Sequence, residues 1–74
     1  MKSSSERKQI LFGQTIRELR HKAGMTLAEL AKRAHIHPSY VADVERGERN
    51  LSLVNILKLA VGLRVHPSKL FMKL

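Results

Sequence analysis

Four residues in the stretch "HPSYVADVERGERN" (37–50) recur at intervals of three or four: Ser39, Ala42, Asp43 and Arg46. At this spacing they share one face of a helix. Serine donates and accepts hydrogen bonds, aspartate accepts them, and arginine donates to oxygen atoms in pairs. Alanine leaves room for a close approach. The pattern favours a face that lies against a polar, negatively charged partner.

The residues after this face extend the same chemistry. Arg49 and Asn50 follow Arg46 within one short loop, and Ser52 stands where it can cap a further helix. The first turn of a capped helix presents free N–H groups and the positive end of the helix dipole, both favourable to phosphate. The loop and the helix start together predict an anion-contacting surface.

Net charge points in the same direction. Fourteen Lys and Arg residues against six Asp and Glu give the 74-residue chain a charge of +8. Such a surplus attracts nucleic acid, anionic membrane or acidic protein. The only aromatic residues are Phe12, Tyr40 and Phe71, too few for the stacking platform that binds single strands.

A membrane role is disfavoured by the sequence. No apolar run is long enough to span a bilayer, and "MKSSSERK" lacks the apolar part of a signal peptide. The basic helix predicted near the N-terminus carries Arg17, Arg20 and Lys22 but needs its apolar stripe for a core. We expect a soluble, cytoplasmic protein that is not bound to membranes.

Metal-binding and catalytic patterns are absent from the sequence. The chain has no cysteine, and its four histidines lack the spacing of metal ligands. No serine stands in a recognisable nucleophile arrangement, and no Gly-rich phosphate loop occurs. We therefore expect no metal, no cofactor, no small-molecule ligand and no enzymatic activity.

Helical spacing recurs along the whole chain. Residues 1–6 are polar, and we expect them to be flexible. Phe12, Ile16, Leu19 and Ala23 form one stripe of a helix over about residues 7–23, which Gly24 can end. A second helix over about 26–34 starts at a capping box.

The box consists of Thr26 and Glu29, and Leu27, Leu30 and Ala31 face inward from this second helix. A third helix starts at His37-Pro38, because proline suits the first helical position, and it ends at Gly47. Its Val41 and Val44 face inward, with Tyr40 partly so.

A fourth helix starts at Ser52 and is expected to use Leu53, Ile56, Ala60 and Leu63 toward the core. "VHPSKLF" repeats the His-Pro-Ser start and predicts a short fifth helix from Pro67. The chain is thus expected to be a compact all-α domain of five helices. The second and third form a helix-turn-helix, with residues 7–74 as one domain.

From Phe12 to about Phe71 the chain resembles the helix-turn-helix family of phage repressors (Cro/C1, Xre-type), which has a lambda-repressor-like fold. The matching segments are "IRELRHKAGMTLAELAKRAHI", "YVADVERGERNLS" and "LKLAVGLRV". Its shortness and the "YVADVERGERNLSL" segment look most like controller proteins of restriction–modification systems. Antitoxins and phage-type repressors, some acting with a protein partner, share the same core and remain the alternative.

The resemblance implies a transcriptional regulator that binds sequence-specifically to double-stranded DNA. Residues matching Pro38, Ser39, Tyr40 and Asp43 approach base edges or the sugar-phosphate, and the loop residues grip the backbone. The family often has a glutamine where this chain has Leu27, so that phosphate contact is either missing here or taken over by Thr26 or Arg17. The expected DNA-contacting set is Arg17, Thr26, Pro38, Ser39, Tyr40, Ala42, Asp43, Arg46, Arg49, Asn50 and Ser52.

Direct base readout is expected to be sparse. Pro38 and Ala42 have no side-chain donors, although Ala42 can touch a thymine methyl group. Asp43 can accept from cytosine, or it can hold Ser39 or a nearby arginine, and the sequence leaves both open. We therefore expect DNA shape to carry much of the specificity.

One pair of charged residues is expected to be structural. Arg20 and Glu45 match a partly buried ion pair of the family. Glu45 is also adjacent to inward-facing Val44, where an unpaired carboxylate is costly. The pair is expected to tie the first helix to the end of the third.

The C-terminal part is too apolar for a lone surface. No residue from Leu53 to Leu74 is acidic. Apolar side chains off the expected core face are typical of an interface, and we expect a two-fold dimer formed by residues 52–74. The alternative is that the fifth helix covers this stripe. The expected dimer residues are Val54, Val61, Val65, Phe71, Met72 and Leu74.

Overall fold

The computed structural model describes residues 2–74, and the regular elements in that part of the chain are all helices. Four α-helices are followed by a short 3-10 helix: α1 (Ser4–Lys22), α2 (Leu27–Ala34), α3 (Pro38–Glu45), α4 (Leu53–Leu63) and η1 (Pro67–Phe71). The all-α prediction with a helix-turn-helix at α2 and α3 is confirmed. The fifth element differs in type, because it winds as a 3-10 helix.

Helix α1 begins earlier than predicted. Ser3 caps it by accepting from the Glu6 N–H at 3.1 Å, and the Glu6 carboxylate accepts from the Ser3 N–H at 3.3 Å. This reciprocal pair satisfies two donors that a helix start otherwise leaves free. The start of α1 thus lies within residues 1–6, the segment for which flexibility was predicted, and residue 1 lies outside the described residues.

The other helix starts follow the predicted signals. Thr26 accepts from the Glu29 N–H at 3.1 Å, and Glu29 accepts from the Thr26 N–H at 2.9 Å. His37 caps α3 with its ring, whose Nδ1 accepts from the Ser39 N–H at 3.2 Å. His66 caps η1 in the same way. Proline occupies the first helical position of both α3 and η1.

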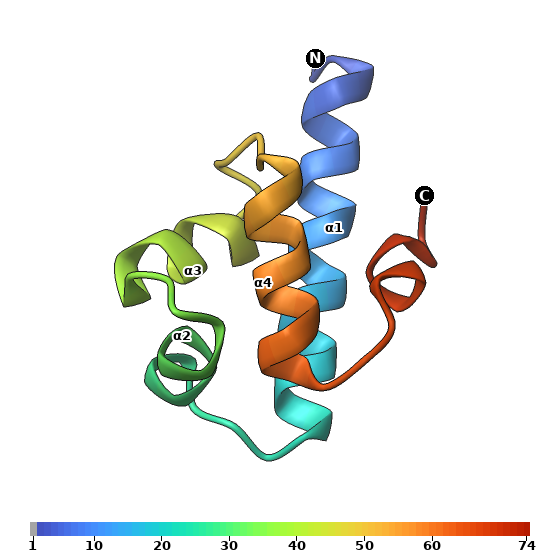
Figure 1. The fold of residues 1–74 in the computed structure, drawn as a ribbon. Helices are drawn as coiled ribbons and strands as arrows, with labels where there is room; N and C mark the ends of the chain where they lie inside the picture. Colours follow the sequence, from blue (N-terminus) through green and yellow to red (C-terminus); the bar gives the residue numbers. More distant parts are fainter. Residues whose placement is uncertain (1) are drawn as a thin grey trace.

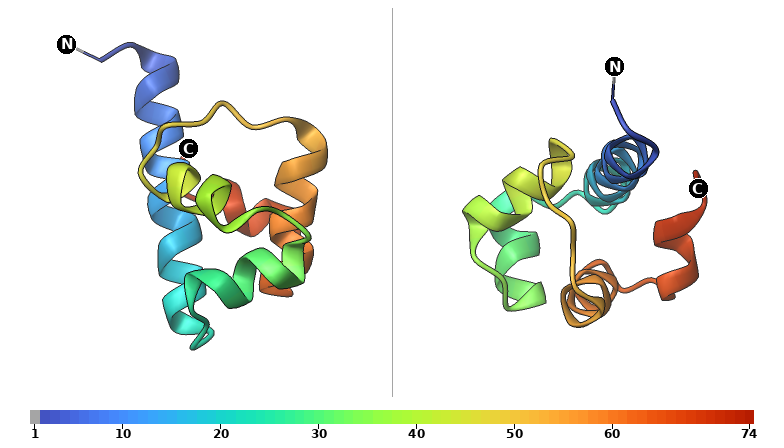
Figure 2. Two further views of the ribbon diagram at one scale, coloured as in Figure 1. Left: turned by 90° about the vertical axis from the view of Figure 1, so that its left-hand side faces the viewer. Right: turned by 90° about the horizontal axis from the view of Figure 1, so that it is seen from above.

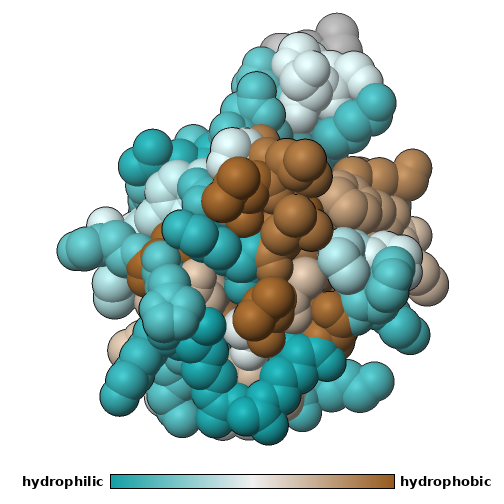
Figure 3. All heavy atoms as spheres, in the orientation of Figure 1, coloured by the Kyte–Doolittle hydropathy of each residue, from teal (hydrophilic) through white to brown (hydrophobic). Residues whose placement is uncertain are grey.

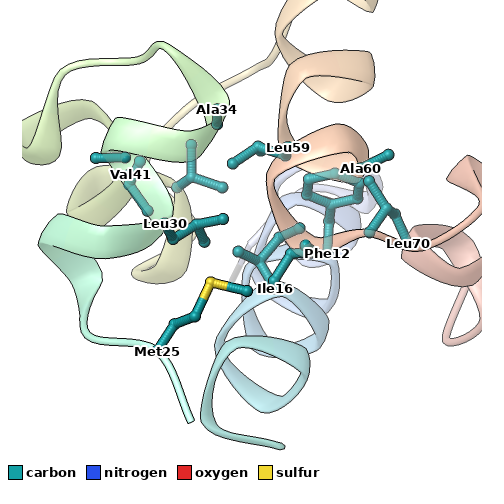
Figure 4. Close-up of a cluster of buried hydrophobic side chains, with 12 residues drawn as sticks. Phe12, Ile16, Met25, Leu30, Ala34, Val41, Leu59, Ala60 and Leu70 are labelled. Carbon is teal, nitrogen blue, oxygen red and sulfur yellow. The ribbon is translucent and has the colours of Figure 1, made fainter. Parts of the chain in front are cut away.

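The five elements surround one core (Figures 1 and 2). Seen from above in Figure 2, α1 and α4 lie across from each other, with α2 and α3 on one side and η1 on the other. Each element contributes a side chain with 0% exposure, and Figure 4 shows these side chains converging: Ile16, Leu30, Val41, Leu59 and Leu70. The small domain is held together by this single shared cluster.

Helix α4 buries a different set of residues from the one predicted. Leu59, Ala60 and Leu63 are buried, and Ile56 is partly buried. Leu53, expected in the core, is 70% exposed. The prediction failed because α4 is apolar on most sides, so its periodicity fits more than one stripe.

Glycine sets the distance between α1 and α3. A Cβ atom at Gly13 would come within 2.1 Å of the Val44 carbonyl oxygen and 2.9 Å of the Glu45 carbonyl oxygen. No side chain fits there, so the missing Cβ allows the two backbones to touch. The end of α3 is thereby fixed against the middle of α1.

Candidate nucleic-acid interface

Helix α3 lies at the edge of the domain (Figure 1) and turns its valine side toward the core. Val41 and Val44 are buried, whereas Pro38 and Ser39 are exposed. Ala42 and Asp43 are half-buried at the edge of this outer side. The predicted face therefore exists as one surface, with its polar and small residues directed outward.

The start of this face is ordered by a histidine. The Ser39 hydroxyl lies 2.7 Å from Nδ1 of His37, the same nitrogen that accepts from the Ser39 N–H. With Nδ1 unprotonated, the hydroxyl donates to the ring and keeps its oxygen lone pairs free. Ser39 then presents an acceptor to any donor that approaches α3.

Asp43 lies at the centre of a charged cluster at the other end of α3. Its Oδ1 accepts from Nη2 of Arg46, and its Oδ2 accepts from Nη2 of Arg49 at 3.1 Å and Nε at 3.2 Å. Of the two roles left open by the sequence, the contacts are those of a residue that holds arginines. Asp43 does not bond to Ser39, whose hydroxyl is with His37.

Both arginines have a second neighbour. Nε of Arg46 donates to Glu48 at 2.7 Å, and this hydrogen bond, with the charges of Glu48 and Asp43, raises the pKa of Arg46. The Arg49 guanidinium lies 4.9 Å from the centre of the Tyr40 ring, a cation–π distance. Tyr40 thus connects the core side of α3 with the loop.

The four remaining predicted contact residues lie at separate places on the surface. Arg17 is exposed on α1. Thr26 and Ser52 are exposed caps, and Ser52 accepts from the Asn55 N–H at 3.2 Å. Asn50 lines a surface hollow of about 240 Å³ together with Arg49 and Lys8, which lies near the start of α1. Hydrogen bonds join Asp43, Arg46 and Arg49 into one cluster, whereas the caps belong to separate helices.

The expected ion pair between α1 and α3 is present. Arg20 Nε donates to Glu45 Oε2 at 2.7 Å, and Nη2 donates to Oε1 at 2.9 Å. Nη1 donates to the Met25 carbonyl at 3.1 Å. The side chains are 11% and 8% exposed, and the hydrogen bond with Glu45 raises the pKa of Arg20. This pair fixes the end of α3 from within.

A family model described as helix-turn-helix matches residues 16–70, most of the chain and both helices of the motif. The chain belongs to the helix-turn-helix family. Control protein C.BamHI from Bacillus amyloliquefaciens is 44% identical over 62 residues, which cover 82% of this chain and 76% of that protein. Control protein C.MunI from Mycoplasma sp is 35% identical over 63 residues, covering 84% and 85%.

Solved structures agree with the fold of this helix-turn-helix protein. The restriction-modification controller protein C.AhdI from Aeromonas hydrophila superposes with a TM-score of 0.86 at 49% identity. The match covers 88% of this chain and 98% of that one. The resemblance stated from the sequence, down to the controller proteins, is confirmed.

The second prominent surface of the helix-turn-helix protein is apolar. Figure 3 shows it over α4, with a further apolar area beside the C-terminal end. All residues of the predicted dimer set except Val65 are exposed here. Phe71 is exposed although the centre of its ring lies 5.6 Å from the centre of the Phe12 ring. Sequence reasoning missed two more, Leu53 and Leu57. The exposed apolar residues are Leu53, Val54, Leu57, Val61, Phe71, Met72 and Leu74.

Val65 was wrongly assigned to this exposed set. It is half-buried and packs against the core. The preceding Arg64 adopts the left-handed conformation, with φ 57°, and the Val65 N–H bonds to the Ala60 carbonyl at 3.1 Å. This helix-ending turn folds the residue after the left-handed position back onto the helix.

Two further features concern residues 2–74 as a whole. None of their helices combines the length and apolarity that crossing a membrane requires. In the same residues, no three histidine, cysteine, aspartate or glutamate side chains gather where a metal ion could be held.

Sequence reasoning missed two residues that shape the interface, Gly13 and Glu48, and it identified His37 as the start of the third helix without foreseeing that the ring itself accepts the hydrogen bond. The serine two places after each His-Pro histidine was a usable signal for the cap, since a ring nitrogen reaches a nearby backbone N–H. Glu48 and Gly13 carried no comparable signal, because their partners come from the loop path and from a different helix.

Proposed function

We propose that the protein is a transcriptional regulator that binds double-stranded DNA sequence-specifically as a homodimer and acts as a controller of a restriction–modification system. The observation that carries this proposal is the outward side of α3, which continues into the loop with Arg46 and Arg49. The similarity to three control proteins supports the controller role. It acts by binding rather than by catalysis, in the cytoplasm.

The dimensions of α3 suit the major groove. The groove is about 12 Å wide and admits one α-helix, and in helix-turn-helix proteins the second helix of the motif enters it. Ser39 supplies an acceptor, Ala42 a methyl group and Pro38 a flat apolar edge near the helix start. Tyr40 contacts the sugar-phosphate beside them.

Phosphate contacts come from the cationic loop and the helix caps. Arg46, Arg49 and Asn50 grip one strand, and the free N–H groups behind Ser52 face a phosphate there. Thr26 and Arg17 contact the other side of the groove in place of the glutamine that the family often carries. Asp43, although part of the expected set, acts through the two arginines.

The exposed apolar residues of α4 and the C-terminal end support dimerisation. A contiguous apolar area on so small a protein is typical of an interface. A two-fold dimer places its two α3 helices about 34 Å apart, one turn of DNA. The operator is then two half-sites related by two-fold symmetry.

The experiment is selection of bound duplexes from a random library, followed by titration of the selected site at several salt concentrations. We expect a two-fold-related motif, and an affinity that falls about 10³-fold or more between 50 and 200 mM salt. No selected motif and flat salt dependence would contradict DNA regulation and favour a protein partner, as in an antitoxin.

Arg49→Ala provides the matched variant for the phosphate contact. Binding should weaken on selected and unrelated duplexes alike, and the salt slope should fall by about one. Fluorescence anisotropy at four salt concentrations measures both quantities. A loss confined to the selected site would assign Arg49 to base readout instead.

Sedimentation equilibrium tests the dimer. The wild type should be dimeric at micromolar concentration, and Val61→Glu should be monomeric, because a charge would be buried in the apolar interface. Lys22→Glu, at an exposed position at the end of α1, is the control for added negative charge outside this surface. A monomeric wild type would refute the dimer and leave DNA binding to be judged separately.

A further inference from the structure

The charge of the α3–loop segment is compensated within the segment itself. Asp43 and Glu48 together carry as many negative charges as Arg46 and Arg49 carry positive ones, and each arginine is bonded to at least one carboxylate. The arginines proposed to grip DNA therefore do not present bare charges in the free protein. A phosphate that approaches them meets side chains that already have partners.

Asp43 differs from Glu48 in what it joins. Each of its oxygens accepts from a different arginine, so that one carboxylate links the end of α3 to the loop. Glu48 bonds to Arg46 and is 57% exposed, a contact that adds charge compensation without bridging the arginines.

The depth of the Asp43 carboxylate also matters. Its side chain is 26% exposed, against 58% for Arg46 and 49% for Arg49. The carboxylate thus lies beneath the two guanidinium groups, which form the outer layer. A base edge would reach the arginines before it reached Asp43, whose two oxygens are both already accepting hydrogen bonds.

We propose that Asp43 is a positioning residue that sets the discrimination between the operator and other DNA. It holds Arg46 and Arg49 in one relative geometry. Its negative charge also weakens their attraction for phosphates that do not fit that geometry. The inference rests on the proposed DNA binding and adds a specificity-determining residue to it.

The physical basis is the difference between non-specific and specific binding. Non-specific binding is almost wholly phosphate electrostatics, to which freely moving cations adapt well. Arginine has five N–H donors, and the pairing with Asp43 leaves the others free for a correctly placed phosphate. Ordering the side chains before binding removes an entropy cost only where the ordered geometry is the one required. Asp43 therefore lowers affinity for unrelated DNA more than affinity for the operator.

The test compares Asp43→Asn with Glu48→Gln in the full chain. Both variants remove one negative charge near Arg46, but only the first breaks the bridge between the arginines. Fluorescence anisotropy on the selected duplex and on an unrelated duplex, between 50 and 200 mM salt, gives affinities and salt slopes.

For Asp43→Asn we expect unrelated DNA to bind more tightly, with a salt slope steeper by about 0.9. The preference for the selected duplex should fall at least about tenfold, out of the 10³ or more typical of specific binding. Glu48→Gln should tighten binding to both duplexes by the same factor and leave the preference unchanged. Asp43→Ser, neutral and smaller, should repeat the result if asparagine perturbs the fold.

Equal effects of Asp43→Asn and Glu48→Gln on both duplexes would overturn the inference, because charge alone would then explain them. A changed base preference at a single operator position would also overturn it, since Asp43 would be reading that base directly. A wild type that does not prefer its selected duplex would instead refute the proposed function.

Discussion

The chain uses the same turn twice with different results. At residues 35–39 and 64–68, a left-handed residue is followed by a half-buried apolar residue and then by His-Pro-Ser. His37 and His66 have nearly identical backbone angles, φ −64° and ψ 139° against φ −65° and ψ 140°. Ser39 and Ser68 donate their N–H to the rings at 3.2 and 3.1 Å. The local turn is therefore encoded by these residues and is independent of its place in the fold.

The helix that begins after each turn depends on the next apolar residues. After His37, Val41 and Val44 are both buried, three residues apart, and the chain continues as the eight-residue α3. After His66, Leu70 is the buried residue and the chain forms the five-residue η1. The two helices share their cap and differ in the number of buried residues that follow it, in agreement with packing as the main source of helix stability.

The two helices also differ in how their ends are attached to α1. The end of α3 is held by the nearly buried pair of Arg20 and Glu45. Beyond η1, Lys73 pairs with Glu18 of α1, and this pair is largely exposed. The end of the helix proposed to read DNA is thus held by a nearly buried ion pair, whereas the segment proposed to meet a second subunit is held by a more exposed one.

The largest expected effect comes from breaking these attachments. Glu45→Ala should lower the free energy of unfolding by about 3 kcal/mol, because it leaves the Arg20 charge nearly buried without its partner. Glu18→Ala, which breaks the exposed pair with Lys73, should lower the free energy of unfolding by no more than about 0.5 kcal/mol. Urea denaturation measures both, and equal losses would show that the two attachments do not differ in strength.

A smaller effect is expected from removing the histidine caps one at a time. His37→Ala and His66→Ala should each cost about 1 kcal/mol of unfolding free energy, the usual value for a lost cap. Only His37→Ala should also weaken DNA binding in a folded sample, because it loosens the start of α3. His37→Asn, which keeps a capping acceptor, should restore both stability and DNA binding. If His66→Ala weakened DNA binding as much as His37→Ala, the two turns would not differ in function.

The smallest effect concerns α2, whose capping box pairs the Thr26 hydroxyl with the Glu29 carboxylate. Hydrogen bonds from the Thr26 backbone and side chain lower the pKa of Glu29 below its ordinary value, which is about 4.3. A lowered pKa contributes stability that is complete above the unfolded value and is lost as the pH falls through the folded value. Denaturation midpoints from pH 5 to pH 3 should therefore fall less in Glu29→Gln than in the wild type. Parallel curves would show that the charge of this cap adds nothing.

The helix starts were predictable because each depends on residues within four positions. Thr26 with Glu29 and the two His-Pro pairs were read correctly, and Ser3 with Glu6 carries the same kind of signal at the start of α1. The buried face of α4 was not predictable from periodicity, since Leu53, Leu57 and Leu59 are equally apolar. Its choice depends on where the other helices lie.

The charged cluster of the candidate site shows the same limit. The sequence left Asp43 with two possible roles, and its contacts depend on a loop that returns Arg49 to the end of α3. The fit of Val65 against the core likewise followed from the turn at Arg64 rather than from hydropathy. Residues whose partners come from the path of the chain need the structure to be assigned.

The absence of a side chain at Gly13 has a consequence for engineering. Since even a methyl group there would collide with the final carbonyls of α3, any substitution forces α1 and α3 to shift relative to each other. Libraries that aim to retarget the protein to new operators should vary the outward residues of α3 and keep this position as glycine.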